Sequence, residues 1–341
     1  MMWLSPWMRP LARVYCEQLI ASGWDVALVT TDRHPESDGA RPYERVLDAR
    51  PKTASTWPGF ARALRWARGF APDVVVTELV RDPRWIALAG GAPRVELIHD
   101  DRPHGADEER PGWERRLFGR WGDSAASTVA FSRYVGDRVA ADAVVPLTSD
   151  LDAARVPGFV AAGDRRDFVA VGRLTAYKNL DVTLAAWERH VAGAGWRGDE
   201  LVLIGDGAGP ARLSPTVRWR RGPYSYDDVL GPMARAKGSV AHYRVATQSG
   251  VQVLAMQLGV TPIVSGEGAL PEFQPAGEGA IGVDDVAALA GAFDSLAEPG
   301  AAERRGRAAR AHYAGAHSAA VSAAALDAEL RRVCARAERT S

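Results

Sequence analysis

The sequence has little lysine, little cysteine and no net charge. Of its 42 basic residues, lysine occurs only at Lys52, Lys178 and Lys237, and all the others are arginine. The 42 acidic residues balance them. This balance argues against a general nucleic-acid binder, which needs a basic excess to displace counterions. Two cysteines, Cys16 and Cys334, make neither a disulfide framework nor a metal pattern, and they predict a reducing, cytoplasmic location.

Long apolar runs are missing as well. No stretch of about 18 apolar residues occurs, so we expect no membrane span. The first 20 residues contain Arg9 and Arg13 and no long apolar run, so we do not expect a signal peptide. A chain of 341 residues is longer than one hydrophobic core usually supports, which predicts two domains.

Short β-branched runs alternate with helical stretches along most of the chain. The runs are continuously apolar, as in parallel strands that helices cover on both faces. Expected strands are 24–32, 72–79, 94–100, 127–132 and 143–147, then 167–174, 200–207, 216–222, 238–243 and 260–266. Expected helices include 10–22, 58–70, 111–122, 133–140, 178–194, 225–236 and 249–258.

This alternation predicts an α/β fold of two Rossmann-like parallel-sheet domains that face each other across a central cleft. A turn-rich segment at 148–166 marks the junction. We therefore expect an N-terminal domain at 1–150, a C-terminal domain at 151–312, and a C-terminal helix at 313–341 that packs across the domains.

The loops after the expected strands carry the chemistry, because ligands bind at the carboxyl ends of parallel strands. In "AVGRLTAYKNL", Arg173 ends a strand and Lys178 opens a helix. Arginine grips oxyanions in a bidentate manner, lysine adds a point charge, and a helix N-terminus adds free N–H groups. The pair predicts a diphosphate site. The alternative is two solvated charges, but an arginine would then serve as well as the rare lysine.

A second anion site follows the strand at 238–243. Ser249 and Gly250 open a helix after a polar loop, so backbone N–H groups would face an anion there. The next strand ends in a glycine loop that carries Glu267 and Glu272. Two neighbouring phosphate sites form the strongest pattern in the sequence.

Two other loops resemble known motifs only superficially. In "IGDGAGP" (204–210) the glycine spacing does not fit a dinucleotide fingerprint, so we interpret it as a turn beside the nucleotide. In "HDDRPH" (99–104) neighbouring side chains diverge, and a third acidic cluster is missing, so we expect no metal. His99 is better interpreted as a hydrogen-bonding or charge-stabilising group.

Together, "VGRLTAYKNLD", "LIGDGAG", "ATQSGV" and "GVTPIVSGEGALPE" resemble glycosyltransferase family 4 in order and spacing. "GWDVALVTTD", "PDVVV", "IHD" and "VAFSRYVGD" fit its first half, so the resemblance covers roughly residues 3 to 300. It implies a retaining enzyme with the GT-B fold. The co-substrate would be a nucleotide-diphosphate sugar, and we expect a UDP-sugar. No metal would be required.

The resemblance also implies roles for particular residues. Arg173 and Lys178 would neutralise the donor diphosphate, His99 would lie beside the donor sugar, and transfer would occur on the front face. The implied catalytic residues are His99, Arg173, Lys178 and Glu272. The implied donor-binding residues are Gly172, Arg173, Lys178, Gly205, Asp206, Tyr224, Gln248, Ser249, Gly250 and Val251.

The sequence departs from the family in two places. Where the family carries two glutamates separated by seven residues, this chain has Ala246 and Leu254, as in a variant with "TQSGV". Glu272 or Glu267 would then contact the donor sugar. The first loop, "SPWMRP", lacks the usual glycines, which suggests that Trp7, Met8 and Arg9 shape the acceptor side.

Several alternatives stay open at this point. A non-catalytic homologue that binds nucleotide or partners another transferase would explain Ala246 and Leu254. A nucleotide-sugar epimerase would need an acid and base pair that we do not find. The segment "GWERRLFGRW" (112–121) reads either as an ordinary amphipathic helix or as a weak peripheral membrane contact. The acceptor and the oligomeric state are not specified, and closure of the domains on the donor is a further hypothesis.

Overall fold

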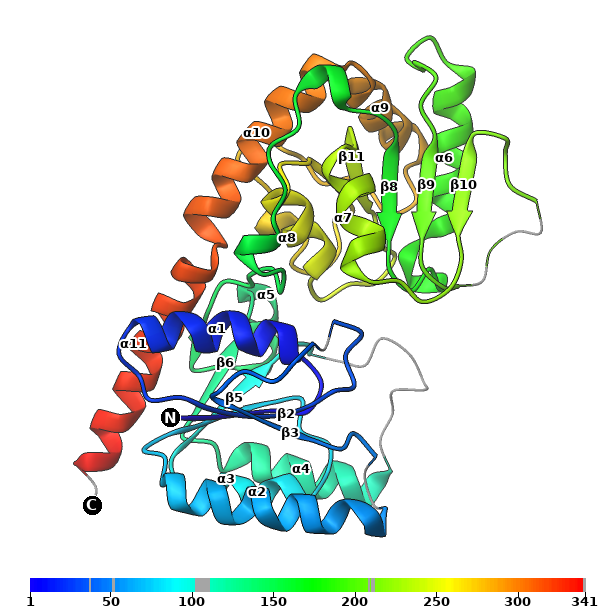
Figure 1. Cartoon of the computed structure of the whole chain (residues 1–341). Coiled ribbons are helices and arrows are strands. Elements are labelled where there is room, and N and C mark those ends of the chain that lie inside the picture. The colour runs from blue at the N-terminus through cyan, green and yellow to red at the C-terminus, as the bar shows by residue number, and fades with distance from the viewer. Residues whose placement is uncertain (37, 51–52, 102–110, 208, 210–211, 340–341) are drawn as a thin grey trace. The chain divides into compact units, whose positions relative to one another are not determined.

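The computed structural model describes the chain except for residues 37, 51–52, 102–110, 208, 210–211 and 340–341. It separates into two compact units, each described by itself below (Figure 1). The first comprises Met1–Leu151 together with Ala319–Ser341, and the second comprises Asp152–Ser318.

The first unit is built on a parallel sheet of seven strands in the order β3-β2-β1-β4-β5-β6-β7. The strands are β1 (Met2–Ser5), β2 (Ala27–Thr31), β3 (Glu44–Leu47), β4 (Val75–Glu78), β5 (Arg94–Ile98), β6 (Ser127–Ala130) and β7 (Ala143–Val144). The helices are α1 (Arg9–Ala21), α2 (Trp57–Phe70), α3 (Arg84–Ala89), α4 (Gly112–Asp123), α5 (Arg133–Val139) and α11 (Ala319–Glu338).

Helices cover both faces of this sheet. In Figure 1, α2, α3 and α4 lie on one face, and α1 and α11 lie together on the other. Every residue of β1, β2 and β4 is buried, which explains why these strands have no polar-apolar alternation. Proline in the first turn starts α1 and α2, where its missing N–H is not needed.

The second unit is built on a parallel sheet of five strands in the order β10-β9-β8-β11-β12. The strands are β8 (Phe168–Val171), β9 (Leu201–Ile204), β10 (Val217–Arg220), β11 (Gly238–Ala241) and β12 (Pro262–Val264). The helices are α6 (Leu180–Ala192), α7 (Tyr226–Ala234), α8 (Gly250–Gln257), α9 (Val286–Ala297) and α10 (Pro299–Ala316). Helices α6 and α9 pack on each other, and α10 packs on α8.

The core of the second unit is aromatic beneath α6 and α9. Phe168, Trp187 and Phe293 are fully buried, and their ring centroids lie 5.0–5.6 Å apart in edge-to-face arrangements. Lys237 is buried nearby. Its Nζ donates to Asp199 Oδ2 at 2.8 Å and to the carbonyl oxygen of Ala297 at 2.6 Å, so this lysine is a structural group.

The predicted pair of Rossmann-like parallel-sheet domains is confirmed, and four elements were not among those expected. These are β1, β3, α3 and α9. At the C-terminus, residue 313 lies inside α10, and a separate helix, α11, packs on α1 within the first unit. The Trp24 indole donates to Asp327 there, and Ser127 bonds Glu329.

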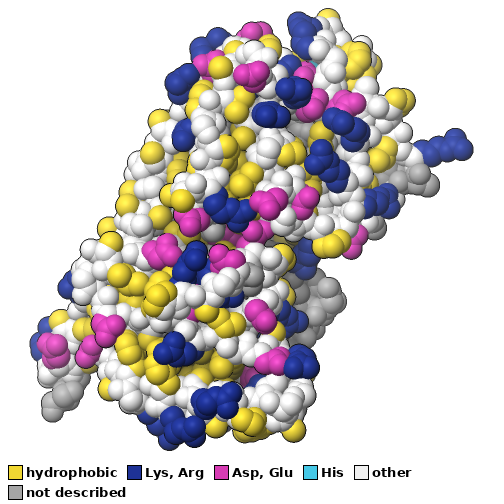
Figure 2. Space-filling view, viewed as in Figure 1, with side chains coloured by type: hydrophobic (Ala, Val, Ile, Leu, Met, Phe, Trp, Pro, Cys, Tyr) yellow, Lys and Arg dark blue, Asp and Glu magenta, His cyan; other side chains and the backbone are white. Residues whose placement is uncertain are grey.

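Two surface properties bear on function. Within the described residues, none of the helices has both the length and the apolar character needed to cross a bilayer. Figure 2 shows basic and acidic side chains intermixed over the visible face. This mixture fits the balanced charge of the sequence.

Candidate active site

The first part of the site is a pair of glycine turns at the carboxyl ends of β8 and β9. Gly172 (φ 124°) and Gly205 (φ 127°) adopt backbone conformations that favour glycine. A Cβ on Gly205 would lie 2.1 Å from the carbonyl oxygen of Gly172 and 3.1 Å from the Tyr224 ring. The Leu174 amide donates to the Asp206 carbonyl at 2.7 Å. The fold therefore brings Gly172, Gly205, Asp206 and Tyr224 together.

Lys178 lies beside these turns, at the end of the 3-10 helix η5 (Ala176–Lys178). Lys178 Nζ would lie 3.2 Å from a Cβ placed on Gly172. The same Nζ lies 3.8 Å from the centroid of the Tyr243 ring. Burial lowers the pKa of Lys178 to about 8. No carboxylate among the described residues forms an ion pair with it, whereas Lys237 has Asp199. Lys178 is thus a half-buried cation whose charge no carboxylate of the described residues neutralises.

A buried asparagine holds the Lys178 segment in place. Asn179 is fully buried with φ 55°. Its Nδ2 donates to the Val283 carbonyl at 2.6 Å, and its Oδ1 accepts from Arg244 at 2.7 Å. The Arg244 amide in turn donates to the Tyr177 carbonyl at 2.8 Å. Arg173, by contrast, is exposed to solvent.

The second part of the site is the N-terminus of α8. Ser249 caps this helix, its Oγ accepting from the Gln252 amide at 3.3 Å. Gly250, the first helical residue, is exposed, and Val251 is half-buried. Gln248 is also half-buried, and its Oε1 has no hydrogen-bond partner within the part of the chain that is described. Free N–H groups and the helix dipole favour an anion at this end.

Tyr243 joins the two parts. Its hydroxyl lies 3.1 Å from Ser249 Oγ, and the face of its ring contacts the Lys178 ammonium. The sequence analysis did not select Tyr243. The only signal was its place directly after an apolar strand, two residues beyond the last residue of β11.

The glycine loop after β12 packs directly on the segment before α8. Gly268 (φ 58°) comes so close that a Cβ on it would lie 2.2 Å from the Ala246 carbonyl oxygen. Glu267 in this loop and Glu272 in the 3-10 helix η6 (Pro271–Phe273) are both half-buried. Ala246 and Leu254 are buried, at 2% and 5% exposure, as apolar residues that contribute to packing.

In the first unit, His99 follows β5 and is held by Glu78 at the end of β4. His99 Nε2 lies 2.7 Å from Glu78 Oε1. Glu78 is fully buried, and its other oxygen accepts from the Trp3 indole at 3.3 Å. A carboxylate only accepts, so the proton of this hydrogen bond lies on His99 Nε2. Glu78 was missed by the sequence analysis, although it ends a strand that neighbours β5 in the sheet.

One expectation about the first loop is wrong. Arg9 is only 2% exposed, and its guanidinium bonds Glu44 at 2.8 Å. Arg13 bonds the same carboxylate. Burial raises the pKa of Glu44, but the arginine hydrogen bonds outweigh burial and bring it to about 2. Arg9 therefore stabilises the fold and does not shape an acceptor site, whereas Trp7 is 45% exposed.

Helix α4 is exposed along one side only. Phe118 is buried, and Trp121 packs against it. Trp113 and Leu117 are 54% and 37% exposed. The segment that suggested a metal site continues into residues 102–104, which lie outside the described residues. Within the described residues, no group of three or more His, Cys, Asp or Glu side chains is placed to hold a metal ion.

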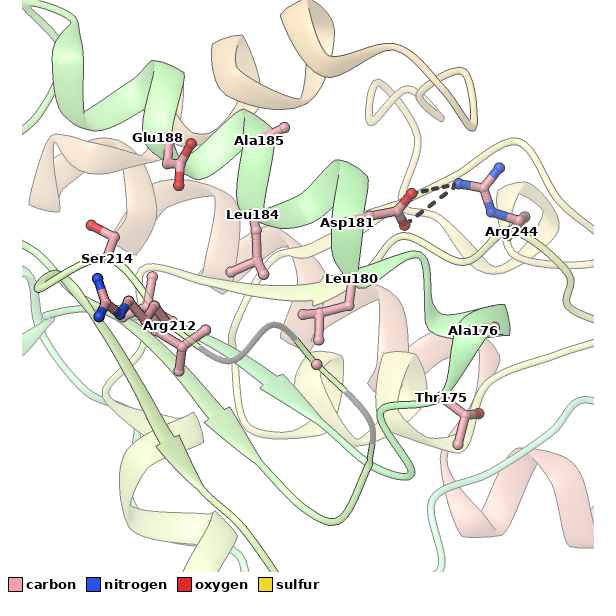
Figure 3. A pocket seen from close by; sticks show the side chains of 13 residues that line it. Thr175, Ala176, Leu180, Asp181, Leu184, Ala185, Glu188, Arg212, Ser214 and Arg244 are labelled. Atoms are coloured by element: carbon pink, nitrogen blue, oxygen red, sulfur yellow. Dashed lines mark hydrogen bonds and ion pairs between the residues drawn. The ribbon is translucent and has the colours of Figure 1, made fainter.

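A cavity of about 680 Å³ lies between α6 and the segment 212–217 that leads into β10 (Figure 3). Leu180 and Leu184 of α6 form part of its wall, and an ion pair between Arg244 and Asp181 lies at one end. It reaches Thr175 and Ala176 but is lined by none of the candidate catalytic or donor-binding residues. The cavity is therefore separate from the site around Lys178.

Sequence comparisons cover both units. Residues 12–148 match the model of Glycosyltransferase Family 4, and residues 165–298 match the model of Glycosyl transferases group 1. Together the two matches span most of the chain. A search of curated proteins found no match.

Solved structures share the fold over almost the whole chain. Sucrose-phosphate synthase from Thermosynechococcus elongatus is 18% identical, with a TM-score of 0.71, covering 98% of this chain and 99% of its own. Anabaena HepE in complex with UDP and glucose is 13% identical, with a TM-score of 0.66 and coverage of 97% and 99%. Trehalose 6-phosphate synthase from Burkholderia multivorans is 14% identical, with a TM-score of 0.64 and coverage of 99% and 98%.

At these identities the solved structures establish the fold, and the two family models establish the class of protein. The chain therefore belongs to the glycosyltransferases and has the GT-B fold.

Proposed function

We propose that the protein is a retaining, metal-independent glycosyltransferase that moves a sugar from a UDP-sugar to an acceptor. The observation that carries the proposal is the group formed by Lys178, Tyr243 and Ser249. It combines a helix N-terminus with a cation that pairs with no carboxylate in the part of the chain that the structure describes. Two similar structures, HepE in complex with UDP-glucose and a UDP-forming trehalose-phosphate synthase from Burkholderia vietnamiensis, support UDP as the nucleotide.

The donor would bind with its diphosphate between the glycine turns and α8. Gly172 and Gly205 have no side chains to keep the ligand from the backbone. Lys178 would neutralise one phosphate, and the amides of Gly250 and Val251 would hold the other through the helix dipole. Arg173 is exposed on the loop after β8, and its guanidinium would bind the same oxygens. These groups are in place before the reaction, so they would stabilise the charge that develops on the leaving diphosphate.

The sugar end of the donor needs a carboxylate and a hydrogen-bonding group. Glu272 is our candidate for the first, with Glu267 as the alternative on the same loop. His99 is our candidate for the second, as a neutral imidazole held by Glu78. The leaving phosphate would accept the acceptor's proton on the front face, so the protein contributes mainly positioning and electrostatics.

The first unit would contribute the acceptor side. The acceptor class stays broad: a natural product, a saccharide or a lipid. Trp113 and Leu117 are exposed beside Arg115 and Arg116 on α4, which supports a weak peripheral membrane contact of a cytoplasmic enzyme. Co-sedimentation with anionic vesicles tests that contact, and no binding would rule it out.

Ligand binding is the first experiment. We would measure thermal shifts with UDP, GDP, ADP and their sugars, in EDTA, for the wild type and Lys178→Ala. A stabilising shift with UDP that the variant loses supports the site. No shift with any nucleotide would contradict the proposal.

Turnover tests the rest of the proposal. Transfer to a panel of acceptors, with the anomeric configuration read by NMR, decides whether the enzyme retains configuration. UDP binding without transfer or donor hydrolysis would favour a non-catalytic nucleotide-binding homologue, for which the buried Ala246 and Leu254 are the motivating observation.

A further inference from the structure

Tyr243 occupies an unusual position between the two anion-binding groups of the second unit. The side chain is only 3% exposed. Its ring centroid lies 3.8 Å from Lys178 Nζ, and its hydroxyl lies 3.1 Å from Ser249 Oγ. One rigid side chain therefore contacts a residue after β8 and a residue after β11.

The backbone of Tyr243 is itself fixed. Its amide donates to Ser265 Oγ at 3.1 Å, and Ser265 Oγ donates back to its carbonyl oxygen at 2.6 Å. The Tyr177 ring packs edge-on against it, with centroids 6.2 Å apart. Burial raises the pKa of Tyr243 to about 12, so the hydroxyl keeps its proton near neutral pH. These contacts give the ring one defined position.

An aromatic ring and a carboxylate hold a lysine in different ways. The face of a tyrosine ring attracts an ammonium group, and it does so most strongly when water is excluded from the pair. A carboxylate would hold the ammonium too, but it would also neutralise the charge and compete with an incoming anion. Lys237, held by Asp199, shows that second arrangement in the same unit. The ring keeps the charge of Lys178 available for a ligand.

We propose that Tyr243 is a positioning residue of the donor site. Its ring presents the Lys178 ammonium, and its hydroxyl orients Ser249 at the start of α8. The two contacts to a diphosphate are thereby held at a fixed separation. This inference rests on the proposed function for its ligand, whereas the contacts themselves exist in the free protein.

NMR of the free protein tests the ring contact without any ligand. The chain has three lysines, Lys52, Lys178 and Lys237, so lysine labelled with ¹³C at Cε gives three signals. The ring current of Tyr243 should move the Lys178 ε-protons upfield. Tyr243→Phe should keep this shift. Tyr243→Leu should reduce it to the smaller contribution of the Tyr177 ring, whose centroid lies 5.4 Å from Lys178 Nζ, while the Lys237 signal stays in place. A Lys178 signal that is unchanged in Tyr243→Leu would overturn the proposal.

UDP binding tests the consequence for the ligand. We expect Tyr243→Leu to weaken UDP binding at least about tenfold, because this variant no longer holds the Lys178 ammonium in position. A tenfold change in affinity corresponds to about 1.4 kcal/mol. We expect Tyr243→Phe to weaken it about threefold to fivefold through the lost hydroxyl contact. If the wild type does not bind UDP, the proposed function fails, and the NMR result still decides whether the ring holds Lys178.

A double-mutant cycle covers the case in which Tyr243→Leu does not fold. Tyr243→Phe and Ser249→Ala each remove one side of the hydroxyl contact. If the contact orients Ser249, the double variant should bind UDP about as weakly as the weaker single variant. Additive losses would overturn the link between Tyr243 and Ser249.

Discussion

Replacing Lys178 by methionine should stabilise the free protein while removing UDP binding. The pKa of Lys178 falls from its ordinary 10.5 to about 8 because the ammonium is buried. At about 1.4 kcal/mol for each pH unit, this difference corresponds to about 3 kcal/mol of unfavourable burial below pH 8. The contact with the Tyr243 ring offsets about 1–2 kcal/mol. Methionine fits a site between aromatic rings, so we expect Lys178→Met to raise the free energy of unfolding by about 1–2 kcal/mol at pH 7.

The difference in stability between Lys178→Met and the wild type should shrink as the pH rises. The pKa of Lys178 is lower in the folded state than in the unfolded chain, so the folded protein loses this proton first. The wild type therefore becomes more stable between about pH 8 and pH 10.5, and the variant does not share that increase. From pH 7 to pH 9 the difference between the two proteins should fall by about 1 kcal/mol.

Urea denaturation at pH 7 and pH 9 measures both effects, and Lys237→Met provides a matched control. Lys237 is more deeply buried than the half-buried Lys178, and it pairs with Asp199. Its removal leaves the buried Asp199 carboxylate without a cation, so we expect a loss of about 3–5 kcal/mol in the free energy of unfolding. If Lys178→Met were as destabilising as Lys237→Met, or if its effect were the same at both pH values, the argument that Lys178 is a desolvated, unpaired cation would be wrong.

Three further predictions follow from the same contacts. UDP should raise the pKa of Lys178, so binding at pH 8 should take up about half a proton and weaken at higher pH; calorimetry in buffers of different ionisation enthalpy measures this uptake. Glu44→Gln should lower the free energy of unfolding by about 3–5 kcal/mol, because it leaves the buried Arg9 without its carboxylate and leaves Arg13 with the exposed Asp38 alone. In the wild type this stabilisation should be lost as the pH falls from 4.5 to about 2, which an acid titration by circular dichroism follows. Gly205→Ala should lower the Tm and abolish the UDP shift, because its Cβ would lie 2.1 Å from the Gly172 carbonyl oxygen; Gly291→Ala, in α9 with open space around it, should leave both at least as high. A Gly205→Ala protein that still binds UDP normally would contradict the close approach of the two turns.

Much of the site could be predicted because its residues follow strands that are visible in the sequence. Lys178 and Ser249 both lie in the segments that follow such strands, and parallel strands end at one edge of a sheet. The expectation that Lys178 opens a helix was wrong, because Lys178 ends η5 and α6 begins at Leu180. The role of Arg9 could not be predicted in the same way. An arginine in a predicted loop is expected to be exposed unless a buried partner is known. The partner of Arg9 is Glu44, which lies 35 residues away in a strand that the sequence pattern did not predict.

The architecture could be inferred from the sequence alone, because the spacing of apolar runs and helix starts is a local property of the chain. The rarity of lysine also singled out Lys178. The residues that support the site could be identified only from the fold. Tyr243 meets Lys178 across 65 positions of the chain, and Glu78 meets His99 across 21. Such contacts depend on how strands are ordered in the sheet, which no local pattern encodes. The two lysines differ for the same reason. Lys178 contacts a tyrosine ring and Lys237 pairs with a carboxylate, and the sequence around each lysine does not show which partner the fold brings to it.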